Sequence, residues 1–214
     1  MTGSLPHNDP DRGNGTEGYD VELPFVTQSR DRARILTQEE QQIIAAYRRN
    51  AEKSFRSFYG GIQVDLGGVS RMFDCVAAPF QRKSFEEMTE SLEALRRGDV
   101  PKCQRFWIER TKKSSKDADI AILVLWLIAF PLRPFLAQIG AADSEQAGII
   151  KDRVNRLLFW NPWLKEHVEV QFNQIKSKRV IEGTKTPMAV CNIMAADESG
   201  GHGGTPDLMI VNEL

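Results

Sequence analysis

The stretch FWIERTKKSSKDADIAILVLWLIAF, residues Phe106–Phe130, decides the expected fold. Its beginning belongs to a short apolar segment, Arg105–Glu109, that reads as the first core strand, and a polar loop ending in Lys116 follows. The residues from about 117 to 130 are apolar on nearly every side, which is typical of a helix covered on more than one face. A strand, a lysine loop and a buried helix in this order indicate a loop that binds phosphate.

The loop matches the phosphate-binding (P-loop) template G-x-x-x-x-G-K-[ST] only at its lysine. Arg110 and Ser115 occupy the two glycine positions, and Asp117 occupies the position of the Ser or Thr that would hold Mg²⁺. In such loops the backbone N–H groups and a helix N-terminus surround the anion, and the lysine neutralises its oxygens. The alternative is a solvated basic turn in which Asp117 favours the start of a helix.

The last residues, PDLMIVNEL (Pro206–Leu214), supply a second candidate element. Leu208–Val211 form an expected strand, which Asn212 and Glu213 follow. In ATP hydrolysis an acidic residue at a strand end can coordinate Mg²⁺, and a following glutamate can orient and deprotonate the attacking water. Asn212 takes the metal position and Glu213 the base position, although any strand can end in a polar pair.

Bulk properties restrict the class of protein. The chain has 214 residues with a formal net charge of −1, so no global field indicates a nucleic-acid or membrane partner. Cys75, Cys103 and Cys191 are far apart and form no CxxC pattern, which favours a reducing compartment and argues against disulfides or structural zinc. No signal peptide is visible, and the apolar run 120–132 is shorter than the roughly 20 residues that a membrane span needs.

The pattern of helices and strands predicts an α/β fold with a mainly parallel sheet and flanking helices. Residues 1–35 are polar and rich in turn formers, and we expect a disordered arm there. A helical region, 36–77, and a domain, 78–214, should follow. The expected elements are a helix capped by Thr37 and Glu40 and ended by Gly60, a helix opened by Ser84 and Glu87 and closed by Gly98, a helix capped by Ser144 and ended by Pro162, and strands at 136–140, 168–172, 179–181 and 188–194.

Three stretches together resemble the ATPase half of a large terminase subunit, the DNA-packaging motor of tailed phages. They are ERTKKSSKDADIAILVLWLIAF, FLAQIGAADSEQAGII and NIMAADESGGHGGTPDLMIVNEL, and the resemblance covers about Ala78–Leu214. It implies a P-loop NTPase-type sheet that binds ATP and Mg²⁺. The lysine loop would be a degenerate Walker A motif, and the terminal strand would be Walker B.

The resemblance also assigns site residues. Phe80 and Gln81 in PFQRKSF match an adenine-contact motif, although Gln81 also reads as a surface residue near a helix start. His202, in a loop rich in glycine, would sense the nucleotide or transfer a proton, or would only fix a turn. Lys116 and Glu213 would be catalytic, and Asp117 and Asn212 would hold the metal. The nucleotide contacts would be Phe80, Gln81, Arg110, Lys112, Lys113, Ser114, Ser115, Lys116 and Asp117.

The implied function is ATP hydrolysis that drives viral DNA into the procapsid, in the cytoplasm of a bacterial host. The expected partners are double-stranded DNA, the portal protein, the small terminase subunit and further copies of the chain in a ring.

Because the sequence stops one residue after Glu213, we expect an incomplete ATPase without the strand that follows Walker B or the nuclease domain. It should have a gap or irregular pairing in the sheet, an exposed apolar edge and poor ATP turnover. Two alternatives remain: another P-loop NTPase such as a helicase-like protein, or an inactive remnant that acts as a binding module.

Overall fold

The computed structural model of the chain describes residues 37–111, 114–195 and 205–212. All of them belong to one compact unit, Ala33–Leu214. The expected disordered arm, 1–35, lies outside the described residues. Among the helices of the described part, none combines the length and the apolar character that crossing a membrane requires.

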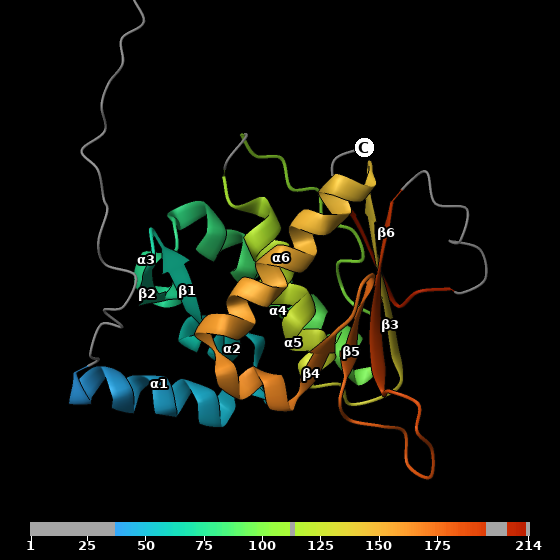
Figure 1. Ribbon diagram of the computed structural model, residues 1–214, viewed down its shortest axis with the longest axis horizontal. Helices are drawn as coiled ribbons and strands as arrows, with labels where there is room; N and C mark the ends of the chain where they lie inside the picture. Colours follow the sequence, from blue (N-terminus) through green and yellow to red (C-terminus); the bar gives the residue numbers. More distant parts are fainter. Residues whose placement is uncertain (1–36, 112–113, 196–204, 213–214) are drawn as a thin grey trace, which may run out of the picture. The chain divides into compact units, whose positions relative to one another are not determined.

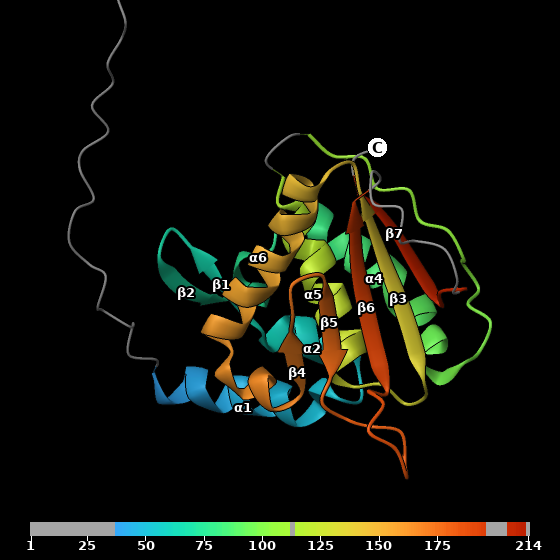
Figure 2. The same cartoon turned by 45° about the vertical axis from the view of Figure 1, so that its right-hand side comes forward.

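The described part contains a five-stranded sheet with helices packed on one face (Figure 1, Figure 2). β3 (Phe135–Ala141) pairs in parallel with both β6 (Ala189–Ala195) and β7 (Leu208–Asn212). β5 (Gln174–Ser177) pairs antiparallel with β4 (Val168–Val170) and with β6. The expected α/β class is therefore confirmed, but the sheet is mixed because its β4 and β5 half is antiparallel. The strand order is β4, β5, β6, β3 and β7.

The apolar run forms the buried helix α5 (Lys116–Ala129), as the sequence predicts. Every residue from Ala121 to Ala129 is buried. The helix packs against α6 (Ser144–Trp160) and against β4, β5 and β6. Coverage by a second helix and by the sheet explains why α5 carries no charged side chain after Asp119.

The N-terminal helix begins as predicted, but it is split into two. The Thr37 hydroxyl accepts the N–H of Glu40 at 3.2 Å, and the Glu40 carboxylate accepts the N–H of Thr37 at 2.9 Å, so the capping box is confirmed. The first helix is α1 (Gln38–Ala51), and α2 (Phe55–Gly61) follows after a short break. Phe55 of α2 lies 5.1 Å from the ring of Trp126 in α5, so α2 contributes to the main core.

The sequence analysis missed a β-hairpin and a short helix that follow α2. β1 (Gln63–Leu66) pairs antiparallel with β2 (Val69–Met72), and α3 (Phe73–Val76) follows. Gly67 and Gly68 form the turn with φ of 63° and 85°. A Gly-Gly pair between two short runs is a hairpin signal that could have located these strands.

Helix α4 (Pro79–Arg97) starts five residues before the expected cap at Ser84. Pro79 is the first helical residue, where its missing N–H costs nothing, and the Ser84 hydroxyl donates to the Phe80 carbonyl at 2.9 Å inside the helix. The predicted opening by Ser84 and Glu87 is therefore wrong. The closure by Gly98 is confirmed, since this residue adopts a left-handed φ of 91°.

The segment Arg105–Glu109 is not a strand, contrary to the prediction. The N–H of Cys103 donates to Ser91 Oγ at 3.3 Å and Arg110 donates to Ser84 Oγ at 3.1 Å, so the segment runs along α4 in the opposite direction. Trp107 at its middle is 92% exposed. In Figure 2 it is a thin line beyond the β7 edge of the sheet. Among the described residues, β3 is the only strand paired with β7.

Two smaller predictions differ from the structure. Asp143, and not Ser144, caps α6, because its carboxylate accepts the N–H of Gln146 at 2.8 Å. A short 3-10 helix, η1 (Pro162–Glu166), follows α6. The strand expected at 179–181 is reduced to a single bridge between Val180 and Pro187, and the strand paired with β6 is β5 instead.

Candidate functional site

The N-terminus of α5 and the C-terminal end of β7 meet at one point. Asn212 Nδ2 donates to Asp117 Oδ1 at 2.9 Å, across 95 positions of sequence. Asn212 is 1% exposed, and its Oδ1 atom is buried with no hydrogen-bond partner in the described part of the chain. The two residues expected to share a metal are therefore in direct contact, with one acceptor oxygen left over.

The start of β7 is anchored firmly enough to place Asn212. The N–H of Leu136 donates to Asp207 Oδ2 at 2.8 Å, and the N–H of Asp207 donates to the Leu136 carbonyl at the same distance. Arg133 forms an ion pair with Asp207 at 2.8 Å. From there the parallel register carries β7 to the pair Ala141 and Asn212. The strand tip is thus set by its pairing with β3.

The lysine loop reaches α5 through a left-handed residue. Ser115 has φ 61° and ψ 23°, and no other described residue except glycine has a positive φ. Its carbonyl accepts the N–H groups of Ala118 and Asp119, each at 3.1 Å, which begins the helix. Ser115 stands at a glycine position of the phosphate-binding template, and its backbone has the conformation that favours glycine there. Lys116 is the first helical residue.

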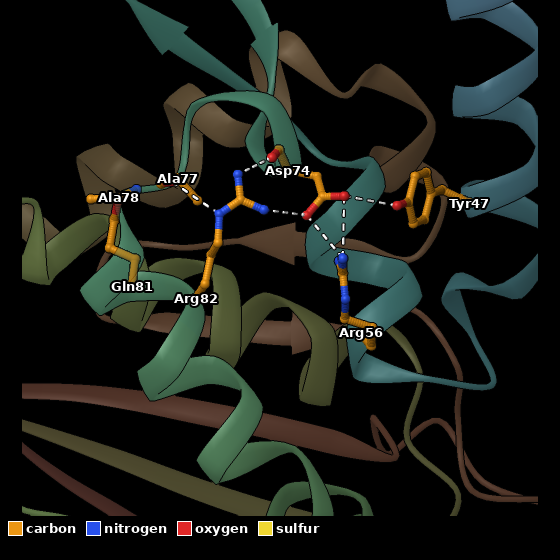
Figure 3. Close-up of polar contacts among 7 residues, drawn as sticks. All are labelled: Tyr47, Arg56, Asp74, Ala77, Ala78, Gln81 and Arg82. Atoms are coloured by element: carbon orange, nitrogen blue, oxygen red, sulfur yellow. Dashed lines mark hydrogen bonds and ion pairs between the residues drawn. The ribbon is translucent and has the colours of Figure 1, made fainter.

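Gln81, the expected adenine contact, lies in the first turn of α4 (Figure 3). Its Oε1 accepts the N–H of Ala78 at 3.0 Å, which satisfies a free donor at the helix start. Arg82 holds the same turn by donating to the Ala77 carbonyl at 3.2 Å and to the Asp74 carboxylate at 3.2 Å. The Gln81 and Arg82 side chains therefore both hold the residues that precede the helix, Ala77 and Ala78.

Asp74 joins this helix start to the N-terminal helices (Figure 3). Its carboxylate accepts hydrogen bonds from the Tyr47 hydroxyl at 2.9 Å and from Arg56 at 3.0 Å. Although burial opposes it, hydrogen bonds from Arg56 and Tyr47 hold the pKa of Asp74 below its usual value. The charged carboxylate thus holds α1, α2 and α4 together, in a structural role.

A buried charged network that the sequence analysis missed links α4 to the lysine loop. Gln81 Nε2 donates to Asp119 Oδ1 at 2.7 Å, and Arg110 Nη1 donates to Asp119 Oδ2. The Arg110 and Asp119 side chains are only 7% and 8% exposed, and the Arg110 guanidinium also lies 4.9 Å from the ring centre of Phe80. Burial raises the pKa of Asp119, and the bonds from Arg110 and Gln81 oppose that rise. Asp119, directly before the apolar run that begins at Ile120, was the available signal, because such charges are buried only with partners.

The structure groups the predicted site residues into two sets. Asp117 and Asn212 form one, next to Lys116; Phe80, Gln81 and Arg110 form the other, around Asp119. Arg110 is engaged in a buried ion pair, which leaves its expected phosphate contact without support. Ser114 precedes Ser115 in the loop, and its N–H donates to the Thr111 carbonyl at 3.2 Å. Lys112, Lys113, His202 and Glu213 lie outside the described residues.

The donor set at Asp117 and Asn212 fits Mg²⁺. In proteins this ion is held by one or two carboxylates together with waters and substrate phosphates, so it needs no cage of protein ligands. The described residues contain no group of three or more His, Cys, Asp or Glu side chains that could form such a cage. The Asp117 carboxylate and the unpaired Asn212 Oδ1 supply two oxygens beside the α5 N-terminus.

Comparison with known proteins supports the fold. No family model matches the chain, and no curated protein matches it. The crystal structure of the HK97 bacteriophage large terminase is similar, with a TM-score of 0.52, at 17% sequence identity over 75% of this chain. The chain spans only 30% of the length of that protein. At this identity, the similarity shows a terminase-like α/β fold.

Proposed function

We propose that the chain is the nucleotide-binding part of a terminase-type DNA-packaging ATPase, a P-loop protein that binds ATP with Mg²⁺. The observation that carries this proposal is the contact between Asp117 and Asn212. It brings the lysine loop and the polar tip of the terminal strand together, as a nucleotide site built from a Walker A loop and a Walker B strand requires. The terminase-like fold supports the same conclusion.

The residues take the following roles. Lys116 and the first turn of α5 hold the phosphates, since a helix N-terminus and a lysine both favour negative charge. Asp117 and Asn212 hold Mg²⁺, which would neutralise charge on the phosphate oxygens when bound. Glu213, one residue beyond Asn212, orients the attacking water. Phe80 and Gln81 contact the base. An open groove of about 260 Å³ between α4 and residues 106–110 is lined in part by Phe80 and Arg110, whereas Gln81 is 8% exposed and does not line it.

The wider biological function belongs to the same proposal. Hydrolysis would drive double-stranded DNA into a procapsid in the host cytoplasm, with the portal protein, the small terminase subunit and a ring of copies as partners. A helicase-like NTPase would use the same lysine and glutamate with a different partner. A second candidate function, a binding module without hydrolysis, is favoured by one observation: the position expected for a carboxylate carries Asn212, whose amide donates to Asp117.

Nucleotide titration with a matched pair of variants tests the proposal. ATP with Mg²⁺ should bind the wild-type chain weakly, and Lys116→Ala should abolish the binding because it removes the phosphate counter-charge. Lys185→Ala is the control, since Lys185 is an exposed lysine on the loop between β5 and β6. Equal binding by both variants would remove Lys116 from the site. An absence of binding in the wild type and in both variants would favour the module without nucleotide.

A further inference from the structure

Asp119 is a buried ionisable residue beside the proposed nucleotide site that has no role in it so far. It lies three residues after Lys116 on α5 and is buried. Its two oxygens are divided between two donors from different parts of the chain: Oδ1 accepts from Gln81 and Oδ2 accepts from Arg110. The carboxylate therefore connects the side of the site expected to contact the base to the loop expected to contact the phosphates.

The Gln81 amide is held at both ends. Its Oε1 accepts the N–H of Ala78, and its Nε2 donates to Asp119. A backbone N–H can only donate and a carboxylate can only accept, so these two partners determine which end of the amide is oxygen and which is nitrogen. Each amide end has a second hydrogen-bonding position, and among the described residues neither of these has a partner.

One free donor beside one free acceptor is the pattern that pairs with adenine. The edge of adenine presents an acceptor, N7, beside a donor, the N6 amino group, whereas the same edge of guanine presents two acceptors. Because the lysine loop would fix the triphosphate, the base would approach Gln81 in one orientation. The order of donor and acceptor on the amide then decides which base fits.

We propose that Asp119 is a positioning residue that sets the base specificity of the nucleotide site, by holding the Gln81 amide in the orientation that matches adenine. The inference rests on the proposed function, because it assigns a further residue to the same site. Arg110 has a supporting part: it neutralises Asp119, stacks on Phe80 and donates to Ser84 on α4. The ion pair keeps the acceptor buried beside Gln81 without leaving an uncompensated charge.

The test compares two neutral replacements of the ion pair that differ only at the acceptor. Arg110→Met combined with Asp119→Asn leaves an amide oxygen that can accept from Gln81, whereas Arg110→Met combined with Asp119→Leu leaves none. Asn and Leu have nearly the same shape. Both pairs avoid the unpaired buried charge that a single substitution would create, so both should fold. The readout is the ratio of ATP affinity to GTP affinity in the presence of Mg²⁺, with a thermal melt to confirm folding.

The wild type should prefer ATP, and the Asn pair should keep that preference. The Leu pair should lose at least about fivefold of it, because a bidentate base contact is worth at least that factor. Asp119→Asn alone should also lose preference: Arg110 would capture the amide oxygen and turn its NH₂ group toward Gln81. Equal ratios in the Asn and Leu pairs, or no ATP preference in the wild type, would overturn the inference and leave phosphate binding by Lys116 standing. If no nucleotide binds the wild type, the proposed function fails and the inference fails with it.

Discussion

Asn212 Nδ2 donates to Asp117 Oδ1 at 2.9 Å, while Asn212 Oδ1 is buried without a partner in the described structure. The pair therefore offers one charged and one neutral oxygen at the junction of β7 and α5. A second carboxylate at position 212 would remove the donor that now satisfies Asp117. If the pair holds Mg²⁺, the effect of the ion on the free energy of unfolding should therefore differ between asparagine and aspartate at position 212.

Asn212→Asp should make thermal stability depend on Mg²⁺. Without the ion, two carboxylates would face each other at hydrogen-bond distance, and we expect a loss of about 2 kcal/mol in the free energy of unfolding. Added Mg²⁺ should restore most of it and should raise the affinity for ATP. Urea unfolding in EDTA and in Mg²⁺ measures the effect. If the difference in stability between EDTA and Mg²⁺ is the same in Asn212→Asp as in the wild type, the metal binds elsewhere.

Asp117→Ala should abolish nucleotide binding that depends on Mg²⁺, since it removes the carboxylate of the pair. Asp143→Ala is a matched control, because Asp143 also stands at a helix N-terminus, as the cap of α6. That variant should lose about 1 kcal/mol of stability through its lost cap and should still bind ATP. Calorimetric titration of both variants separates the two effects. Binding retained by Asp117→Ala would refute the metal assignment.

Ser115→Gly should not destabilise the chain, whereas Ser115→Val should cost more than about 1 kcal/mol. The reason is the φ of 61°, a region that a β-branched side chain tolerates poorly. The same glycine substitution at Ser54, whose φ is −142°, should only lower stability or leave it unchanged. Chemical denaturation of the three variants tests this. A Ser115→Val variant as stable as the wild type would show that the loop does not need the left-handed conformation.

Gly61→Ala should destabilise the packing of α1 on α2. A Cβ at Gly61 would lie 2.3 Å from Tyr47 Cβ, so α1 would have to move, at a cost of about 2 kcal/mol. Gly148→Ala in α6 is the control, because a Cβ there meets nothing within 4 Å. That change should stabilise the helix by about 1 kcal/mol. The melting temperature should fall in Gly61→Ala and rise in Gly148→Ala. A shift in the same direction in both variants would contradict the close approach of Gly61 to Tyr47.

Two of the three cysteines should react rapidly with a thiol reagent. Cys75 and Cys103 are exposed free thiols, whereas Cys191 lies fully buried in β6. Burial raises the pKa of the Cys191 thiol to about 12, so its reactive thiolate is scarce at neutral pH. The third equivalent should appear only on unfolding in urea. In Cys191→Ala the rapid count should stay at two, and a rapid count of three in the wild type would contradict the buried position of β6.

Stability should fall as the pH drops below the ordinary histidine pKa of about 6.5. Burial against Phe130 and Trp163, together with nearby Arg179, lowers the pKa of His167 in the folded chain. Between the two pKa values the unfolded chain therefore binds a proton that the folded chain does not, and this proton favours unfolding. His167→Phe keeps the ring contacts and should flatten the decline between about pH 7 and pH 5. An identical slope in both proteins would exclude His167 as its source.

The sequence by itself determined the elements whose pattern leaves no alternative. The run from Ala121 to Ala129 predicts a helix enclosed on several sides, and the apolar runs of β3, β6 and β7 predict strands. Met209 and Val211 of β7 are nevertheless half exposed. These inferences depend on local periodicity and on residue type. Asp117 and Asn212 were named by their positions in the phosphate-binding template and after the terminal strand, and the resemblance to a terminase ATPase joined them as a metal pair.

Where a segment or side chain had several possible partners, only the tertiary structure determined which one it contacts. Arg105–Glu109 has a strand pattern but lies along α4, because Ser84 and Ser91 bond to its ends. Local sequence could not show that Arg110 would pair with Asp119 instead of facing a phosphate, or that Gln81 would join them from a helix 38 residues away. A buried charge takes whichever partner the fold brings within reach, and only the tertiary structure brings Gln81, at the start of α4, next to Asp119, at the start of α5.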